Sequence, residues 1–181
     1  MADRETSPPQ PSMAANGSRG QLFARASEEC TGLISRIALS YEADPSLRRE
    51  LIQDILLAIW VALSSYRGEA GLKTFVASIA QKRCISHVIK RAREPRQVEL
   101  SPDLVSASPA PDEVAVRNEQ KKRLVESIQL LPIPQREAIV LCLEGFSYQE
   151  IGEILGISAN AAMLRCQRAK TTLKASVEPR P

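Results

Sequence analysis

Hydrophobic residues recur at intervals of three and four along most of the chain, which is the spacing of amphipathic helices. Glycine and proline interrupt the pattern where helices are expected to end. The pattern predicts helices at residues 21–41, 47–63, 72–93, 112–131, 135–143, 147–155 and 158–174. Only 4% of the residues are aromatic, which favours helical cores of Leu, Ile, Val and Ala over a β-sandwich. We therefore expect an all-α fold.

Two of the predicted helices lie near the C-terminus and are joined by a tight turn. Ser147 and Glu150 have the spacing of a capping box, in which each side chain bonds the backbone amide of the other residue. Gly156 stands where a left-handed residue usually ends a helix, and Ser158 can cap the helix that follows. This order of cap, glycine and second cap predicts a helix-turn-helix.

The last predicted helix is positively charged and has two different faces. Residues 165–174 carry four cations and no acid, whereas residues 144–153 carry three acids and no cation. At about 100° per residue, the face suited to a core consists of Ala162, Cys166, Ala169 and Leu173. The opposite face consists of Asn160, Leu164, Gln167, Arg168 and Thr171. A DNA major groove accepts such a face, because Asn, Gln and Arg side chains can read base edges.

A second cluster of positive charge lies at the end of the predicted helix 72–93. Residues 82–96 contain six cations and one acid, Glu94. Solvated helix faces usually carry both signs of charge, so this cluster favours contact with nucleic acid. For the predicted helix-turn-helix, a purely structural helical bundle could carry the same caps and the same turn glycine. The positive charge of the last predicted helix favours DNA binding over a purely structural bundle.

The chain divides into two small helical domains. Residues 1–20 contain three prolines and few large apolar side chains, which predicts a disordered tail. Residues 21–95 form the first domain, in which Asp44 and Pro45 predict a helix start and Trp60 is expected to pack. Residues 96–116 contain three prolines and have a net charge of −3, which predicts a linker. Residues 117–177 form the second domain, with the helix-turn-helix.

Composition excludes several kinds of chemistry. The four cysteines, Cys30, Cys84, Cys142 and Cys166, lack the spacing of a zinc site, and we interpret them as reduced, mostly buried thiols. We find no membrane-length apolar run and no secretion signal, so we expect a soluble, cytoplasmic protein. There is no P-loop, GxSxG motif or paired-carboxylate site, so we expect no catalytic role and no cofactor.

Two stretches of the chain resemble one known family. The motifs LPIPQREA at 131–138 and EGFSYQEIGEILGIS at 144–158 resemble region 4 of bacterial RNA polymerase sigma factors. The motifs ELIQDI at 50–55, YRGEA at 66–70 and KTF at 73–75, with Trp60, resemble region 2 of the same family. Both regions occur in the family's order with a short linker, as in the extracytoplasmic-function sigma factors. The resemblance covers residues 21–175.

The resemblance implies a role for each region. The helix 47–63 should bind the clamp helices of core polymerase through Gln53 and Asp54. The segment 66–75 and the helix after it should open and hold the −10 element, and the candidate residues are Tyr66, Arg67, Phe75, Lys82, Arg83, Lys90 and Arg91. The last helix should enter the major groove of the −35 element, while region 4 docks on the polymerase flap. The −35 candidates are the family's base-reading positions Met163, Leu164, Gln167 and Arg168, the phosphate-contact position Arg165, and the outward-facing Asn160.

Five positions depart from the family pattern. Phe75 stands where Trp is usual and keeps an aromatic ring. Lys82 replaces an Asn that helps to capture a flipped −10 base, and Ser86 replaces an Asp. Met163 and Leu164 replace the more usual Lys or Arg and Ser, and their apolar side chains can touch only a thymine methyl group or a sugar. The sequence therefore does not give the promoter motif.

The sequence thus predicts a dissociable transcription initiation factor that binds core RNA polymerase and directs it to promoter DNA. An anti-sigma factor is a common partner in the resembled family, so such a partner is also considered. Two alternatives remain open. One is a helix-turn-helix regulator that binds duplex DNA as a dimer without polymerase. The other is a helical adaptor that binds only protein and shows no steep salt dependence.

Overall fold

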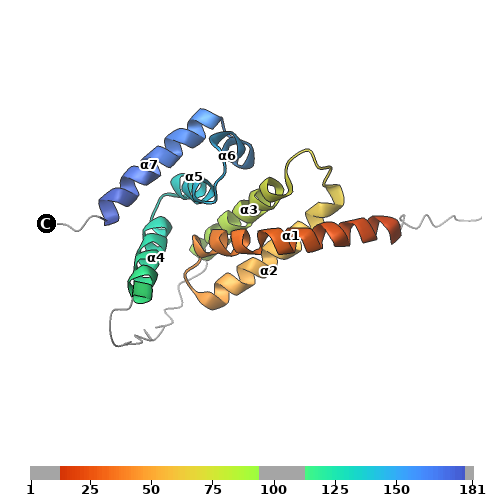
Figure 1. Ribbon diagram of the computed structural model, residues 1–181, viewed down its shortest axis with the longest axis horizontal. Coiled ribbons are helices and arrows are strands. Elements are labelled where there is room, and N and C mark those ends of the chain that lie inside the picture. Colours follow the sequence, from red (N-terminus) through yellow and green to blue (C-terminus); the bar gives the residue numbers. More distant parts are fainter. Residues whose placement is uncertain (1–12, 94–112, 178–181) are drawn as a thin grey trace, which may run out of the picture.

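The computed structural model describes residues 13–93 and 113–177, which form two groups of α-helices (Figure 1). The first group consists of α1 (Met13–Leu39), α2 (Pro45–Ala62), a 3-10 turn (Leu63–Ser65) and α3 (Leu72–Arg93). The second group consists of α4 (Glu113–Gln129), α5 (Ile133–Leu143), α6 (Tyr148–Leu155) and α7 (Ala159–Val177). The described residues contain no strand, and the predicted all-α fold is confirmed.

A local sequence signal sets the start of α2. Asp44 caps α2, because its Oδ1 accepts hydrogen bonds from the amides of Leu47 at 2.9 Å and Ser46 at 2.8 Å, and Pro45 occupies the first turn. The bond from the Leu47 amide contributes most to holding the pKa of the Asp44 carboxyl below its usual value. The bounds of α3 coincide with the predicted helix 72–93.

Helix α1 begins earlier than the sequence pattern predicted. The predicted tail extended to Gly20, but α1 already begins at Met13. Contacts with α2 explain this difference: the Arg19 guanidinium lies 4.2 Å from the ring centroid of Trp60 and donates from Nε to the Trp60 carbonyl at 2.9 Å. Phe23 adds an edge-on contact with the same ring at 5.3 Å. Helix α4 begins at Glu113, one residue after the predicted helix start at 112, and its first turn lies within the stretch 96–116 that was assigned to the linker.

Each group of helices has an apolar interior. In the first group, α1, α2 and α3 pack on one another, and in the second α5 and α6 both pack against α7. The centre of the first group is made by Ile34, Ile37, Leu51, Ile55, Ile59 and Val76, and that of the second by Ile139, Leu141, Ile151, Ala162 and Cys166. Trp60 packs as expected.

The four cysteines are free thiols. Cys30, Cys84 and Cys166 are buried, and Cys142 is half-buried. Burial raises the pKa of the Cys84 thiol to about 12, and burial together with the neighbouring Cys142 raises that of Cys166 to about 11. Thiols that are so rarely ionised are poor nucleophiles, as expected of cysteines that fill a core.

The two groups of helices touch, which the sequence did not predict. Helix α3 of the first group packs against α5 and α6 of the second (Figure 1). None of the helices in the described part of the chain is both long enough and apolar enough to cross a membrane.

Candidate nucleic-acid interface

The predicted helix-turn-helix is present as α6, a tight turn and α7. Ser147 Oγ accepts from the Glu150 amide at 3.2 Å, and the Glu150 carboxylate accepts from the Ser147 amide at 2.7 Å, which completes the capping box. Gly156 ends α6 with a φ of 67°, in the left-handed region. Ser158 Oγ accepts from the Ala161 amide at 3.2 Å at the start of α7. The predicted caps and turn are therefore confirmed.

Gly152 lets the two helices of this motif approach closely. A Cβ atom at this position would lie 2.7 Å from the Ile157 carbonyl oxygen and 3.2 Å from the Ala159 amide nitrogen. Both atoms belong to the backbone of the turn and the start of α7, which cannot yield as a flexible side chain can. The absence of a side chain at Gly152 thus sets how α7 is held against α6.

Helix α7 buries one face and exposes the other, as the helical periodicity predicted. Ala162, Cys166, Ala169 and Leu173 are buried, and α7 packs against α4, α5 and α6. Asn160, Gln167 and Arg168 are exposed, Leu164 is 41% exposed and Met163 is half-buried. The outward face therefore presents an amide pair and a guanidinium beside one exposed leucine.

Arg165 lies at the edge of that face. Its Nη1 is 4.0 Å from Oε2 of Glu137 on α5, and its side chain is 31% exposed. Burial raises the pKa of Glu137, and the charge of Arg165 acts against that rise. A phosphate contact by Arg165 would therefore compete with this ion pair.

The candidate −10 residues fall into two separate places. Tyr66, Arg67 and Phe75 line a pocket of about 330 Å³ beside the 3-10 turn. The rings of Tyr66 and Phe75 lie 4.6 Å apart at 47°, and the Tyr66 hydroxyl donates to the Ala70 carbonyl at 2.6 Å. Both rings are half-buried, so each offers part of its surface for stacking.

The basic candidates lie along α3, away from that pocket. Lys82 and Arg83 are exposed and line a cleft of about 560 Å³ between α2 and α3, which also contains Asp54. Lys90 and Arg91 line the adjoining cleft of about 310 Å³, to which Arg83 also contributes. The structure thus places the basic residues beside the predicted polymerase-binding helix.

Arg91 also has a structural partner. Its Nη1 donates at 2.6 Å to Oε2 of Glu42, whose side chain is 7% exposed. His87 Nε2 lies 2.8 Å from the same oxygen, and the Asp44 amide donates to Oε1 at 2.9 Å. Burial pushes the pKa of Glu42 upward, but the bonds from His87, Asp44 and Arg91 outweigh burial and hold that pKa below its usual value.

The predicted polymerase-binding residues lie on an apolar surface that the sequence analysis missed. Gln53 and Asp54 are exposed on α2. Leu57 and Val61 follow Asp54 at helical spacing and are 62% and 59% exposed. The available signal was that α2 has more large apolar residues than its buried face needs. Exposed apolar residues clustered on one helix face indicate a protein-binding surface.

Comparisons with known proteins agree with this geometry. The sigma-70 region 2 model matches residues 28–94, and the sigma-70 region 4 model matches residues 121–173. A probable RNA polymerase sigma factor, RfaY, of Xanthomonas campestris is 26% identical over 160 residues, and the match covers 85% of this chain and 40% of that protein. The sigma-E factor of Escherichia coli is 24% identical over 170 residues, and the match covers 87% of this chain and 85% of that protein.

The fold also matches solved structures. The sigma factor RpoE of Bartonella quintana, in complex with the anti-sigma factor NepR, superposes with a TM-score of 0.65 at 21% identity, covering 86% of this chain and 96% of that one. At this identity the match concerns the fold, and it extends over both groups of helices.

Proposed function

Since this chain belongs to the extracytoplasmic-function group of the sigma-70 family, we propose that it binds core RNA polymerase and directs it to promoters. In this role, region 2 opens the −10 element and region 4 reads the −35 element. Core RNA polymerase acts inside the cell, so we place the chain in the cytoplasm. We assign it no catalytic activity of its own.

One observation carries this proposal: a capped helix-turn-helix with an exposed polar face lies in the same chain as a basic region 2 helix group with an exposed apolar face. A regulator that binds DNA without polymerase does not need Leu57 and Val61 at the surface. An adaptor that binds only protein does not need Asn160, Gln167 and Arg168 on one face. Both alternatives are therefore less favoured than a sigma factor.

In vitro transcription with core RNA polymerase tests the function directly. We expect transcripts from genomic promoters only when the chain is added to core. If the chain neither binds core nor changes the set of promoters transcribed, the proposed function is wrong. A helix-turn-helix regulator would instead protect duplex DNA from cleavage in the absence of core.

Arg168 is expected to contact a base of the −35 element. Because this side chain is exposed at the centre of the outward face of α7, Arg168→Ala should cost about 1–3 kcal/mol at −35 sites, which is roughly a fivefold to hundredfold loss of affinity. Competitive binding of the holoenzyme to promoters that differ only at −35 measures this loss. Lys174→Ala, which removes another exposed cation of α7, is the matched control and should weaken all promoters alike. Unchanged promoter preference in Arg168→Ala would remove Arg168 from the reading surface.

Leu57 is expected to contact core polymerase together with Gln53, Asp54 and Val61. Burying a leucine contributes about 1.5–3 kcal/mol, so Leu57→Ser should weaken binding to core about tenfold to a hundredfold. A titration of labelled chain with core measures this affinity. Leu130→Ser is the matched control, because Leu130 is 87% exposed but lies between α4 and α5. Equal losses in the two variants would contradict a specific role for α2.

We further propose an anti-sigma factor as a regulatory partner, as in the Bartonella complex. An apolar groove of about 710 Å³ supports this proposal, because it runs between α1, α4 and α5 and so is lined by both regions. Leu124 and Leu143 line it and remain 38% and 57% exposed. A partner that binds in this groove should lower factor-dependent transcription when it is titrated against the chain.

A further inference from the structure

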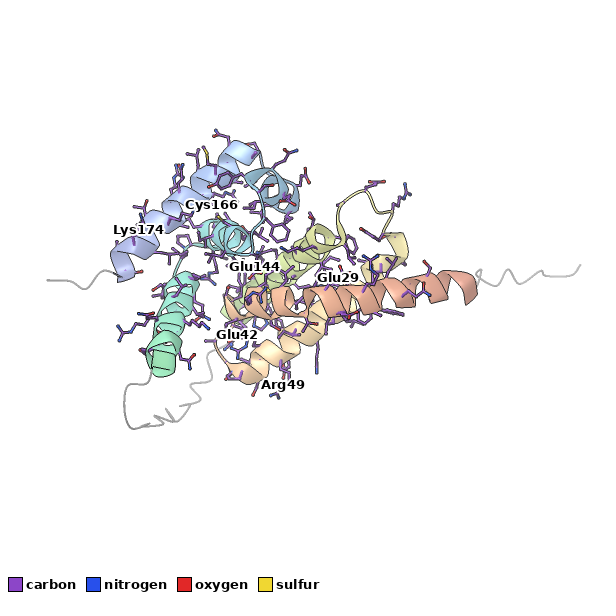
Figure 2. The ribbon with its side chains drawn as sticks, viewed as in Figure 1. Glu29, Glu42, Arg49, Glu144, Cys166 and Lys174 are labelled. Atoms are coloured by element: carbon purple, nitrogen blue, oxygen red, sulfur yellow. The ribbon has the colours of Figure 1, made fainter. Side chains whose placement is uncertain are left out.

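Leu164 is a large apolar side chain exposed on the outward face of α7. It is 41% exposed and lies outside the apolar core. Cys166, two residues later, faces α5, because its Sγ donates to the Ala138 carbonyl at 3.3 Å (Figure 2). At about 100° per residue, Leu164 lies about 200° around the helix from Cys166. It therefore points away from α5, toward the surface assigned to the −35 element.

The first part of α7 carries no charge. Residues 159–164 are Ala, Asn, Ala, Ala, Met and Leu, whereas every cation of α7 follows at residue 165 or later. The recognition helix of a helix-turn-helix contacts base edges through its N-terminal residues. In this part of α7, recognition of bases therefore depends on uncharged side chains.

Two side chains of this uncharged part are both longer than alanine and exposed. They are Asn160 and Leu164, since Met163 is half-buried and the alanines end at Cβ. Asn160 and Leu164 are four residues apart, and Arg168 follows four residues later, so the three side chains lie one above another on the helix. A helix that places Asn160 and Arg168 on base edges therefore also places Leu164 on the floor of the groove between them.

The polar neighbours of Leu164 are available for DNA. In the described part of the chain, the side chains of Asn160, Gln167 and Arg168 form no hydrogen bond with the protein. The Thr171 hydroxyl, by contrast, donates to the Gln167 carbonyl at 3.1 Å. Leu164 is thus flanked by amide and guanidinium groups whose partners would come from outside the chain.

The major groove offers one apolar group to such a side chain. Thymine carries a C5 methyl group there, whereas the edges of adenine, guanine and cytosine present hydrogen-bond donors and acceptors. Against those three edges, leucine would remove water without supplying a hydrogen bond, which is unfavourable. Against thymine, it buries apolar surface on both partners. Leu164 therefore favours thymine over the other three bases.

We propose that Leu164 selects thymine at one position of the −35 element through contact with the C5 methyl group. This inference rests on the proposed function, because it requires α7 to lie in the major groove of that element. The same methyl group is present on 5-methylcytosine and absent from cytosine. The factor should therefore also distinguish these two bases at this position.

Selection from a randomised promoter locates the position. The full chain with core RNA polymerase binds a library made from one genomic promoter whose −35 element is randomised. With the wild type, we expect one position at which thymine is enriched and at which Leu164→Ala shows about threefold to tenfold less preference for thymine. Positions bound through Asn160, Gln167 or Arg168 should keep their preference. Because Leu164 is exposed and alanine is a good helix former, the variant should remain folded.

Deoxyuridine in place of thymine tests the methyl contact by itself, because this base lacks only the C5 methyl group. At the selected position, deoxyuridine should weaken binding of the wild-type holoenzyme about threefold to fivefold, or about 0.7–1 kcal/mol. It should weaken Leu164→Ala by less than about 1.5-fold, and Leu164→Met should recover the wild-type effect. Because the contact is uncharged, the ratio of the two affinities should stay the same from about 50 mM to about 200 mM salt, while both affinities fall.

Leu130→Ala is the matched control, because it shortens an exposed leucine that lies outside α7. This variant should keep the full deoxyuridine effect. A second probe carries cytosine or 5-methylcytosine at the selected position. The wild type should bind the methylated probe about threefold to fivefold more tightly, by the same methyl contact, and Leu164→Ala should bind both probes alike.

The same experiments separate this inference from the proposed function. A thymine preference that Leu164→Ala leaves unchanged, or an equal deoxyuridine effect in the wild type and Leu164→Ala, would overturn the inference. So would a selected −35 element without an enriched thymine. In each of these cases the holoenzyme still selects a −35 sequence, so the proposed function stands. A chain that does not bind core, or a holoenzyme without any −35 preference, contradicts the proposed function itself, and the inference fails with it.

Discussion

Gly152→Ala should destabilise the helix-turn-helix domain by about 1–3 kcal/mol, which is the typical cost of adding a methyl group to a packed site. The new Cβ atom would meet the Ile157 carbonyl at 2.7 Å, and only a shift of the backbone between α6 and α7 can relieve that contact. Because this shift displaces α7, which we propose to read the −35 element, we also expect the molecules that remain folded to bind −35 sites more weakly. Urea denaturation followed by circular dichroism measures the free energy of unfolding.

Gly20→Ala provides a control with the same chemical change. Gly20 lies within α1, and a Cβ atom there would meet nothing within 4 Å. Alanine is the better helix former, so this variant should be more stable by about 0.5–1 kcal/mol. The two substitutions should therefore have opposite signs. If Gly152→Ala is as stable as the wild type, the close approach of α6 and α7 does not depend on this glycine.

Glu42→Ala should destabilise the first group of helices by about 2–3 kcal/mol. It removes a buried carboxylate that accepts bonds from Arg91, His87 and the Asp44 amide, and hydrogen bonds to charged groups contribute about 1.5–3 kcal/mol. The Arg91 side chain is 45% exposed and can turn to solvent when Glu42 is removed. The loss of stability is therefore smaller than for a fully buried ion pair that loses one partner. Trp60 is the chain's one tryptophan, and its fluorescence during urea denaturation reports on this group of helices.

The same carboxylate predicts how stability depends on pH. The folded pKa of Glu42 lies below its usual value of 4.5, so the stabilisation is fully present above that value and is lost as the pH falls through the folded pKa. Glu42→Gln should therefore show a smaller loss of stability on acidification than the wild type. Glu28→Ala, which removes an exposed carboxylate of α1, should change stability by less than about 0.5 kcal/mol and keep the wild-type pH dependence. Parallel pH profiles for wild type and Glu42→Gln would contradict this role of Glu42.

Much of the fold could be predicted because helix ends depend on residues a few positions apart. Asp44 caps α2 through amides two and three residues ahead, and Ser147 and Glu150 complete their box within one turn. The buried and exposed faces of α7 follow from the helical period alone. The family resemblance then supplied roles for these elements, and the matches to both family models confirm the family.

The error at the start of α1 has a different origin. Residues 13–20 have a weak apolar pattern, and what supports α1 there is the contact of Arg19 with Trp60, which is 41 residues away in the chain. Leu57 and Val61 belong to an apolar helix whose buried and exposed sides cannot be separated without knowing where α1 and α3 pack. The individual DNA and polymerase contacts assigned from the resemblance stay predictions.

The sequence by itself determined the helices, their caps, the faces of α7 and the family, since each depends on local spacing or on a motif. Only the tertiary structure decided that the two regions pack on one another and that Glu144 lies between Arg36 and Lys73. Arg36 and Glu144 are 108 residues apart, and neither has a local pattern that marks it for the other. A long-range ion pair is set by how whole helices pack, and packing depends on the combined shape of many side chains, which no single stretch of sequence contains.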